Sequence, residues 1–172
     1  MKSILKIFVV TVIVGTSMSL TAQKSIKIGH IDSQELLSLM PESDSARIVM
    51  ENETKSIQDQ LELMQVEFNN KYNDYVTKMD SLSKFIRQSK EQELQDLQQR
   101  IQIFEGNAQQ SLQQTQAELF QPIIDKAQKA IEEVGNENGF TYIFDSSIGS
   151  IVYKSDDAED IMELVKAKLG IN

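Results

Sequence analysis

The chain has 172 residues and a net charge of −9, from 17 Lys and Arg against 26 Asp and Glu. This acidic balance argues against a nucleic-acid-binding protein, which needs a basic face to neutralise phosphates. With no cysteine and a single histidine, His30, the sequence excludes thiolate catalysis, disulfides, and metal sites built from cysteines or several histidines.

Residues 1–22 have the pattern of a cleavable secretory signal peptide. Lys2 and Lys6 precede a short apolar run, and small residues follow it up to Ala22. The apolar run is shorter than the ~20 residues that a membrane-spanning helix needs, which favours cleavage over a membrane anchor. In a bacterium with two membranes, the sequence therefore predicts a periplasmic protein.

The mature chain begins with a predicted strand and a short capped helix. Residues 26–31 alternate in hydrophobicity as a half-buried strand does. Asp32 and Glu35 have the spacing of a capping box, in which the Asp32 carboxylate accepts from the first free N–H groups of a helix. We therefore interpret Asp32 as a helix cap, and His30 as a packed or edge side chain rather than as a base.

A very long helical segment follows Pro41, which marks a break or a first helical turn. Apolar residues recur at steps of three and four, in two seams with one stutter each. The first seam is Ile57, Leu61, Met64, Phe68, Tyr72, Tyr75, Met79, Leu82 and Ile86, and the second is Leu94, Leu97, Ile101, Phe104, Ala108, Leu112, Thr115 and Leu119. The strip at 87–93 has no apolar residue. A continuous rod is possible, but the near symmetry of the stutters about residue 88 favours an antiparallel hairpin with its tip at 87–93.

Much of the predicted surface of this arm is polar without being charged, because residues 56–121 contain fifteen glutamines. A few apolar residues lie off both seams and are predicted to be partly exposed. They are Leu63, Val66, Val76, Phe85 and Ile103. Such residues either pack against another copy or offer weak contacts to a partner.

Pro122 is predicted to kink or restart the second helix of the arm, whose apolar face continues to Val134. Gly135 and the cluster at 136–139 then stop the helix. Residues 140–144 and 150–154 predict two strands of a β-hairpin.

A last helix is predicted to begin after Ser155 and to end at Gly170. The predicted core is small, so oligomerisation is expected to cover the apolar residues around the strands. Ile28, Ile31, Tyr142 and Ile151 are the candidate interface residues.

The predicted fold class is therefore α+β and mostly helical. A small oligomeric β-sheet body, made of residues 23–42 and 135–172, would carry a projecting antiparallel coiled-coil hairpin over 43–134.

This order of elements resembles the Skp/OmpH family of periplasmic chaperones. The matching segments are 27–32 and 36–42 at the front, and 139–145 and 160–165 at the back. The resemblance covers essentially all of residues 23–170. It implies a homotrimer whose arms enclose a cavity for unfolded outer-membrane proteins, which are held without ATP.

With this resemblance, Val66, Val76, Phe85 and Ile103 become candidate client contacts. A structural scaffold of the cell envelope is the alternative function. The sequence predicts no catalytic residue, cofactor, metal or small-molecule substrate, since it has no phosphate-binding Gly loop and its acid–base groups are dispersed. Unfolded outer-membrane proteins and further copies of the chain are the expected partners, and membrane contact is left open.

Overall fold

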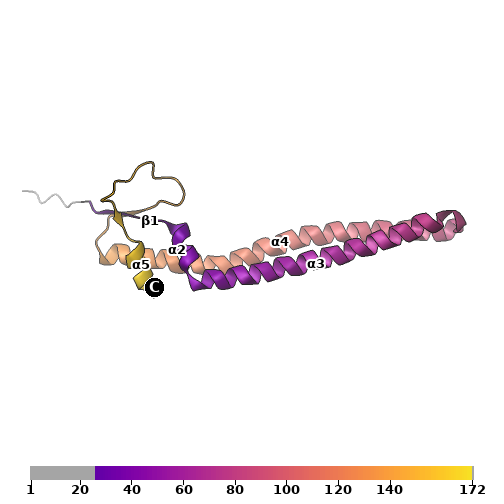
Figure 1. Ribbon diagram of the computed structural model, residues 1–172, viewed down its shortest axis with the longest axis horizontal. Helices are drawn as coiled ribbons and strands as arrows, with labels where there is room; N and C mark the ends of the chain where they lie inside the picture. The colour runs from indigo at the N-terminus through magenta and orange to yellow at the C-terminus, as the bar shows by residue number, and fades with distance from the viewer. Residues whose placement is uncertain (1–25, 172) are drawn as a thin grey trace, which may run out of the picture.

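A computed structural model describes residues 26–171, in which a long pair of helices extends from a small body (Figure 1). The signal peptide predicted over 1–22 lies outside these residues. Within the described range, no helix is both long and apolar enough to cross a membrane.

The protein is mostly helical with one small sheet, as predicted. Its elements are β1 (Ile28–Ile31), α2 (Ser33–Leu39), α3 (Pro41–Lys78), the 3₁₀ turn η1 (Met79–Ser81), α4 (Lys84–Glu137), β2 (Tyr142–Asp145), β3 (Glu159–Asp160) and α5 (Met162–Leu169). The helix α3 has 38 residues and α4 has 54. We call α3, η1 and α4 together the arm, and the remaining elements with the adjoining end of α4 the body.

In the arm, α3 and α4 lie side by side and run in opposite directions (Figure 1). Lys126 of α4 pairs with Glu42 at the body end, whereas Glu93 of α4 pairs with Lys71 towards the far end. The α4 seam is the better buried one, with Leu97 fully covered and Ile101 nearly so. The most buried side chains between the two helices therefore come from α4, and they face a half-buried seam on α3.

The turn of the arm lies at residues 79–83, and not at 87–93 as predicted. Ser83 caps α4 by accepting from the N–H of Ile86, and the Arg87 guanidinium donates to the Met79 carbonyl at 2.8 Å. The polar strip continues α4 because Arg, Gln, Lys and Glu are good helix formers. The Ser83 cap was the signal for this turn that the seam analysis missed.

The sheet has the order β2-β1-β3, and both pairs are parallel. The predicted β-hairpin is wrong, because residues 150–154 lie in the loop after β2 and the third strand is Glu159–Asp160. The Asp145 carboxylate accepts from the backbone N–H groups of Ser33 and Ser147. These bonds tie the end of β2 to the start of α2, so the chain leaves the sheet there instead of reversing beside β2.

Two predicted helix boundaries also change. The helix α4 continues through Pro122 and is not restarted there. Ile123 and Ala127, which lie one helical turn apart after Pro122, are both buried against the body and hold the helix in place. The last helix begins at Met162, whose N–H bonds to the Asp160 carboxylate at 2.8 Å, and not after Ser155. The predicted end of this helix at Gly170 is confirmed, with φ at 72°.

The body core lies where the sheet, α2 and α5 meet the end of α4. Its buried apolar members are Ile31, Leu36, Met40, Ala46, Ile123, Ala127, Ala130, Val134, Ile161 and Val165. Gly29 allows the close approach of β1 to its neighbours, because a Cβ at this position would lie 2.8 Å from Cε1 of Phe140. This core fixes the arm to the body through α4.

Candidate functional site

The face of the sheet opposite the core is only partly covered. Ile28 and Tyr142 are neighbours in the β1–β2 register, and both side chains are exposed. The Phe144 ring stacks on that of Tyr142, with 6.2 Å between the centroids. An apolar face on an edge strand is a common place for another chain to bind.

The loop between β2 and β3 extends beside the sheet on the side away from α4 (Figure 1). Between this loop and the sheet is a cavity of about 540 Å³, lined by Ile28, His30, Phe144 and Ile151 among others. Val152 in the loop is 99% exposed. The cavity and the loop extend the exposed apolar area beyond the strand edge.

The structure separates the four candidate interface residues. Ile28 and Tyr142 are exposed, and half-buried Ile151 lies across the cavity from Ile28. Ile31 is only 2% exposed and belongs to the chain's own core, so its placement at an interface is corrected. Successive residues of a strand point to opposite faces, and Ile31 points to the helices.

His30 and Asp32 do not form an acid–base pair. His30 is a packed side chain whose Nδ1 lies 3.8 Å from a carboxylate oxygen of Asp160 and has no hydrogen-bond partner among the described residues. The Asp32 carboxylate accepts from the Glu35 N–H at 2.9 Å, which confirms its role as a helix cap.

The four candidate client contacts lie along the arm. Val66 and Val76 are on α3, and Phe85 and Ile103 are on α4. All four are exposed, and Phe85 is the most exposed at 78%. The structure does not bring these residues together in one pocket.

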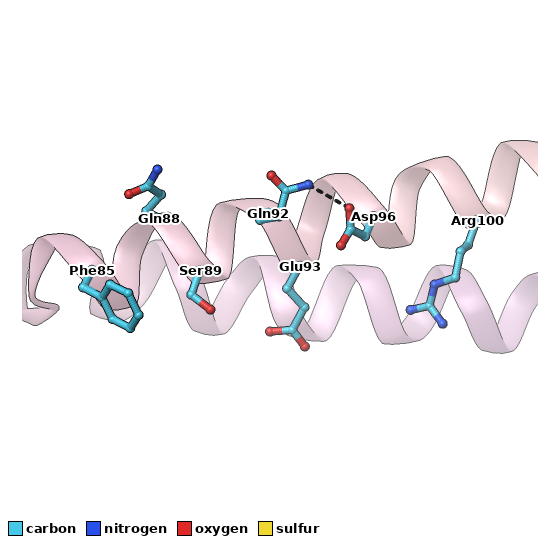
Figure 2. Close-up of a pocket in the computed structure, with 7 residues that line it drawn as sticks. All are labelled: Phe85, Gln88, Ser89, Gln92, Glu93, Asp96 and Arg100. Atoms are coloured by element: carbon cyan, nitrogen blue, oxygen red, sulfur yellow. Dashed lines mark hydrogen bonds between the residues drawn. The ribbon is translucent and has the colours of Figure 1, made fainter.

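A shallow hollow follows α4 near the far end of the arm (Figure 2). Its lining residues are Phe85, Gln88, Ser89, Gln92, Glu93, Asp96 and Arg100. In this view Phe85, Glu93 and Arg100 point to one side of α4, while Gln88 and Gln92 point to the other. The surface offers one aromatic ring amid amide and charged groups, which suits weak contacts better than a chemical reaction.

Glu93 links the two helices at this point. Its carboxylate accepts from Lys71 of α3 and, at 3.0 Å, from Lys90 of α4. The hydrogen bonds from Lys71 and then Lys90 lower the pKa of Glu93 to about 2. Near this link, the hydroxyl of Tyr75 donates to Glu91, and this bond raises the pKa of Tyr75. No pattern in the sequence predicted these links, which join residues 22 and 16 positions apart.

We expect Glu93→Gln to lower the stability of the arm at neutral pH by about 0.2–1 kcal/mol, the range for exposed ion pairs. Folding lowers the pKa of Glu93 below its ordinary value of 4.5. The contribution of its ion pairs to stability is therefore present above pH 4.5 and is lost as the pH falls towards 2. Thermal melting followed by helical circular dichroism at pH 7, 4 and 2.5 measures the effect.

The difference in melting temperature between the parent and Glu93→Gln should therefore shrink on acidification. Glu105→Gln is the matched control, since Glu105 is exposed on α4 and forms no ion pair among the described residues. An equal loss in both variants, or a difference independent of pH, would contradict the role of the link.

Comparison with known proteins identifies the family. The family model described as outer membrane protein (OmpH-like) matches residues 27–169.

The chain belongs to the OmpH-like family.

The solved structures include an OmpH-like relative of the same fold. It is a Caulobacter crescentus CB15 protein assigned as an outer membrane chaperone (OmpH-like), with a TM-score of 0.71 and 14% sequence identity. The match covers 84% of this chain and 83% of that chain. No curated protein matches the sequence. At this identity the likeness shows the fold, and the family itself rests on the OmpH-like model.

The predicted resemblance to the Skp/OmpH family is thus confirmed at the level of the OmpH-like family. Within residues 26–171 of this OmpH-like chain, no three His, Asp or Glu side chains gather as a metal site. Exposed apolar side chains lie on the open side of the sheet and along the surface of the arm.

Proposed function

We propose that the protein is an ATP-independent holdase, which binds unfolded outer-membrane proteins along its arms and prevents their aggregation. Membership of the OmpH-like family points to a chaperone of outer-membrane proteins. The observation that supports holdase activity along the arms is the distribution of exposed apolar side chains on both helices of the arm. An unfolded chain has no fixed shape that a pocket could recognise. A dispersed apolar surface can bind it, because such a surface does not depend on the shape of the bound chain.

Weak, repeated contacts also explain how a client could be released without a nucleotide. A half-exposed Val or Phe side chain that becomes covered contributes ~1 kcal/mol of binding free energy, at about 25 cal/mol per Å² of apolar surface. Several such contacts hold a chain collectively, yet each one breaks readily. A client that can bury its own apolar surface by folding into a membrane would then leave the arm.

The proposal includes assembly through the body. The exposed face with Ile28, Tyr142 and Phe144, and the loop with Val152, would be covered by further copies, in a homotrimer as the family resemblance implies. Three arms projecting from one body would surround a client. Export through the signal peptide at 1–22 would bring the assembly to the periplasm, where such clients pass.

Aggregation of a urea-unfolded outer-membrane barrel after dilution is the direct test. Light scattering should stay low when the protein is present at one assembly per barrel, with no ATP added. A protein that assembles but leaves the scattering unchanged would instead support the envelope scaffold.

We expect the combined substitution of Val66, Val76, Phe85 and Ile103 by serine to weaken client binding by an order of magnitude or more. Each single substitution should change affinity by only a few fold, because the contacts are dispersed. Fluorescence anisotropy of a labelled unfolded barrel measures the affinity, and sedimentation shows that the assembly is intact.

The control for this set is serine substitution of Gln58, Gln65, Gln99 and Gln110, which also lie on the arm but are polar. It should leave affinity nearly unchanged. If one single apolar substitution abolished binding, a discrete site would exist and the dispersed model would be wrong.

A further inference from the structure

Charge is unevenly distributed along the arm. We define a middle zone as residues 48–70 and 101–119, and a distal zone as residues 71–100. The middle zone has one basic and seven acidic residues, a net charge of −6, whereas the distal zone has six basic and five acidic residues, a net charge of +1.

The two zones expose the same number of large apolar side chains. The middle zone exposes Ile48, Val49, Leu63, Val66 and Ile103, and the distal zone exposes Tyr72, Val76, Met79, Phe85 and Ile86. Apolar contact is therefore available in both zones, and charge is the property that distinguishes them.

Within residues 26–171, the negative charge of the middle zone is paired only at Asp59 and at Glu67, which lies 3.7 Å from Lys71 of the distal zone. The one basic residue of the middle zone, Lys55, is already paired with Asp59 at 2.8 Å. Among the described residues, five exposed acids of this zone form no ion pair. They are Glu51, Glu53, Glu62, Glu105 and Glu118.

These acids act together on a bound chain. The α3 part of the middle zone is roughly 33 Å long at ~1.5 Å per residue. Five acids on α3 and two on α4 share this length, so their average spacing along the axis is roughly 5 Å. This is less than the screening length of about 8 Å at physiological salt, so their fields overlap. A positively charged chain is attracted to such a surface, and a negatively charged chain is repelled.

We propose that the middle zone of the arm selects the Lys- and Arg-rich segments of an unfolded polypeptide, while the distal zone binds uncharged apolar segments. The proposal rests on the holdase function and adds the kind of client segment that each zone accepts. Opposite charge and exposed apolar groups occur together in the middle zone, so both contribute to the same bound segment.

Three unfolded barrel segments with the same apolar residues and net charges of about +4, 0 and −4 are the probes. At low salt we expect the cationic probe to bind roughly tenfold more tightly than the neutral one, and the anionic probe to bind most weakly. At high salt the three affinities should converge, because surface charges are screened. A photocrosslinker at position 63 should capture the cationic probe more efficiently than one at position 85.

The matched variants separate local charge from total charge. Changing Glu51, Glu62, Glu105 and Glu118 to glutamine should reduce the preference for the cationic probe to twofold or less. The control changes Glu35, Asp156, Asp157 and Glu163 of the body to the corresponding amides, which alters the net charge equally. This control should keep the preference.

The outcomes distinguish the two proposals. If all three probes bind without a charge preference, or if the two variants lose it equally, the zone assignment is wrong and the holdase function stands. If no probe binds the parent protein, the holdase function fails and the zone assignment fails with it.

Discussion

Replacing Ile28 and Tyr142 together with aspartate is expected to separate the assembly proposed above into single folded chains. Both side chains are exposed in the single chain and lie opposite each other on β1 and β2. In the parent protein, another copy that covers these side chains would bury apolar surface and stabilise the assembly. In the variant, two carboxylates buried without partners would destabilise the assembly by several kcal/mol. Sedimentation equilibrium measures the mass, and circular dichroism measures the retained helix.

The informative comparison is Ile31→Asp. Ile31 is on the same strand but is buried in the core, so aspartate there should unfold the body rather than merely dissociate it. An Ile28→Asp, Tyr142→Asp protein that kept its oligomeric mass would show that this face is not the interface.

Ile161→Ala is expected to lower the free energy of unfolding of the body by about 2–5 kcal/mol, the cost of removing most of a buried Ile side chain. Ile161 is 0% exposed and lies just before α5, against the core. For so small a body this is a large share of the stability. Urea unfolding, followed by the fluorescence of the body tyrosines, measures the change.

Leu164→Ala is the control on the same segment. Leu164 is 42% exposed, so its truncation should cost well under half as much as that of Ile161. If the two variants were equally destabilised, α5 would be packed differently from the structure described. The arm should remain helical in both proteins, because it packs through its own seam.

The arm was the part of the fold most open to prediction from sequence, because helix periodicity is local. The α4 seam with Leu97 and Ile101 and the exposure of Phe85 follow directly from a repeat of three and four residues. The position of the turn does not follow from this repeat, because it depends on hydrogen bonds of Ser83 and Arg87 and not on hydrophobicity. Caps also act locally, which is why Asp32 was recognised correctly.

The body was harder to predict, because its sheet joins residues more than a hundred positions apart. Residues 150–154 have the apolar pattern of a strand but lie in a loop, whereas the two acidic residues Glu159 and Asp160 form β3. The exposure of each β1 residue depends on which face meets the helices, and the predicted interface wrongly combined Ile28 with Ile31, which points to the opposite face. The exposed apolar residues of the arm could be predicted from the sequence, but the interhelical Lys71–Glu93 link depends on how α3 and α4 pack against each other.

The central position of β1 in the sheet has a consequence for the order of folding. Both of its neighbours follow the arm in the chain, so the sheet cannot close until the strands on either side of the arm have come together. The arm, in contrast, can form progressively from its turn, since each new contact adjoins an existing one. Its formation brings residues 41 and 137 to the same end of the molecule and so shortens the loop that β1–β2 pairing must close. The arm is thus a folding template for the body as well as a projection from it.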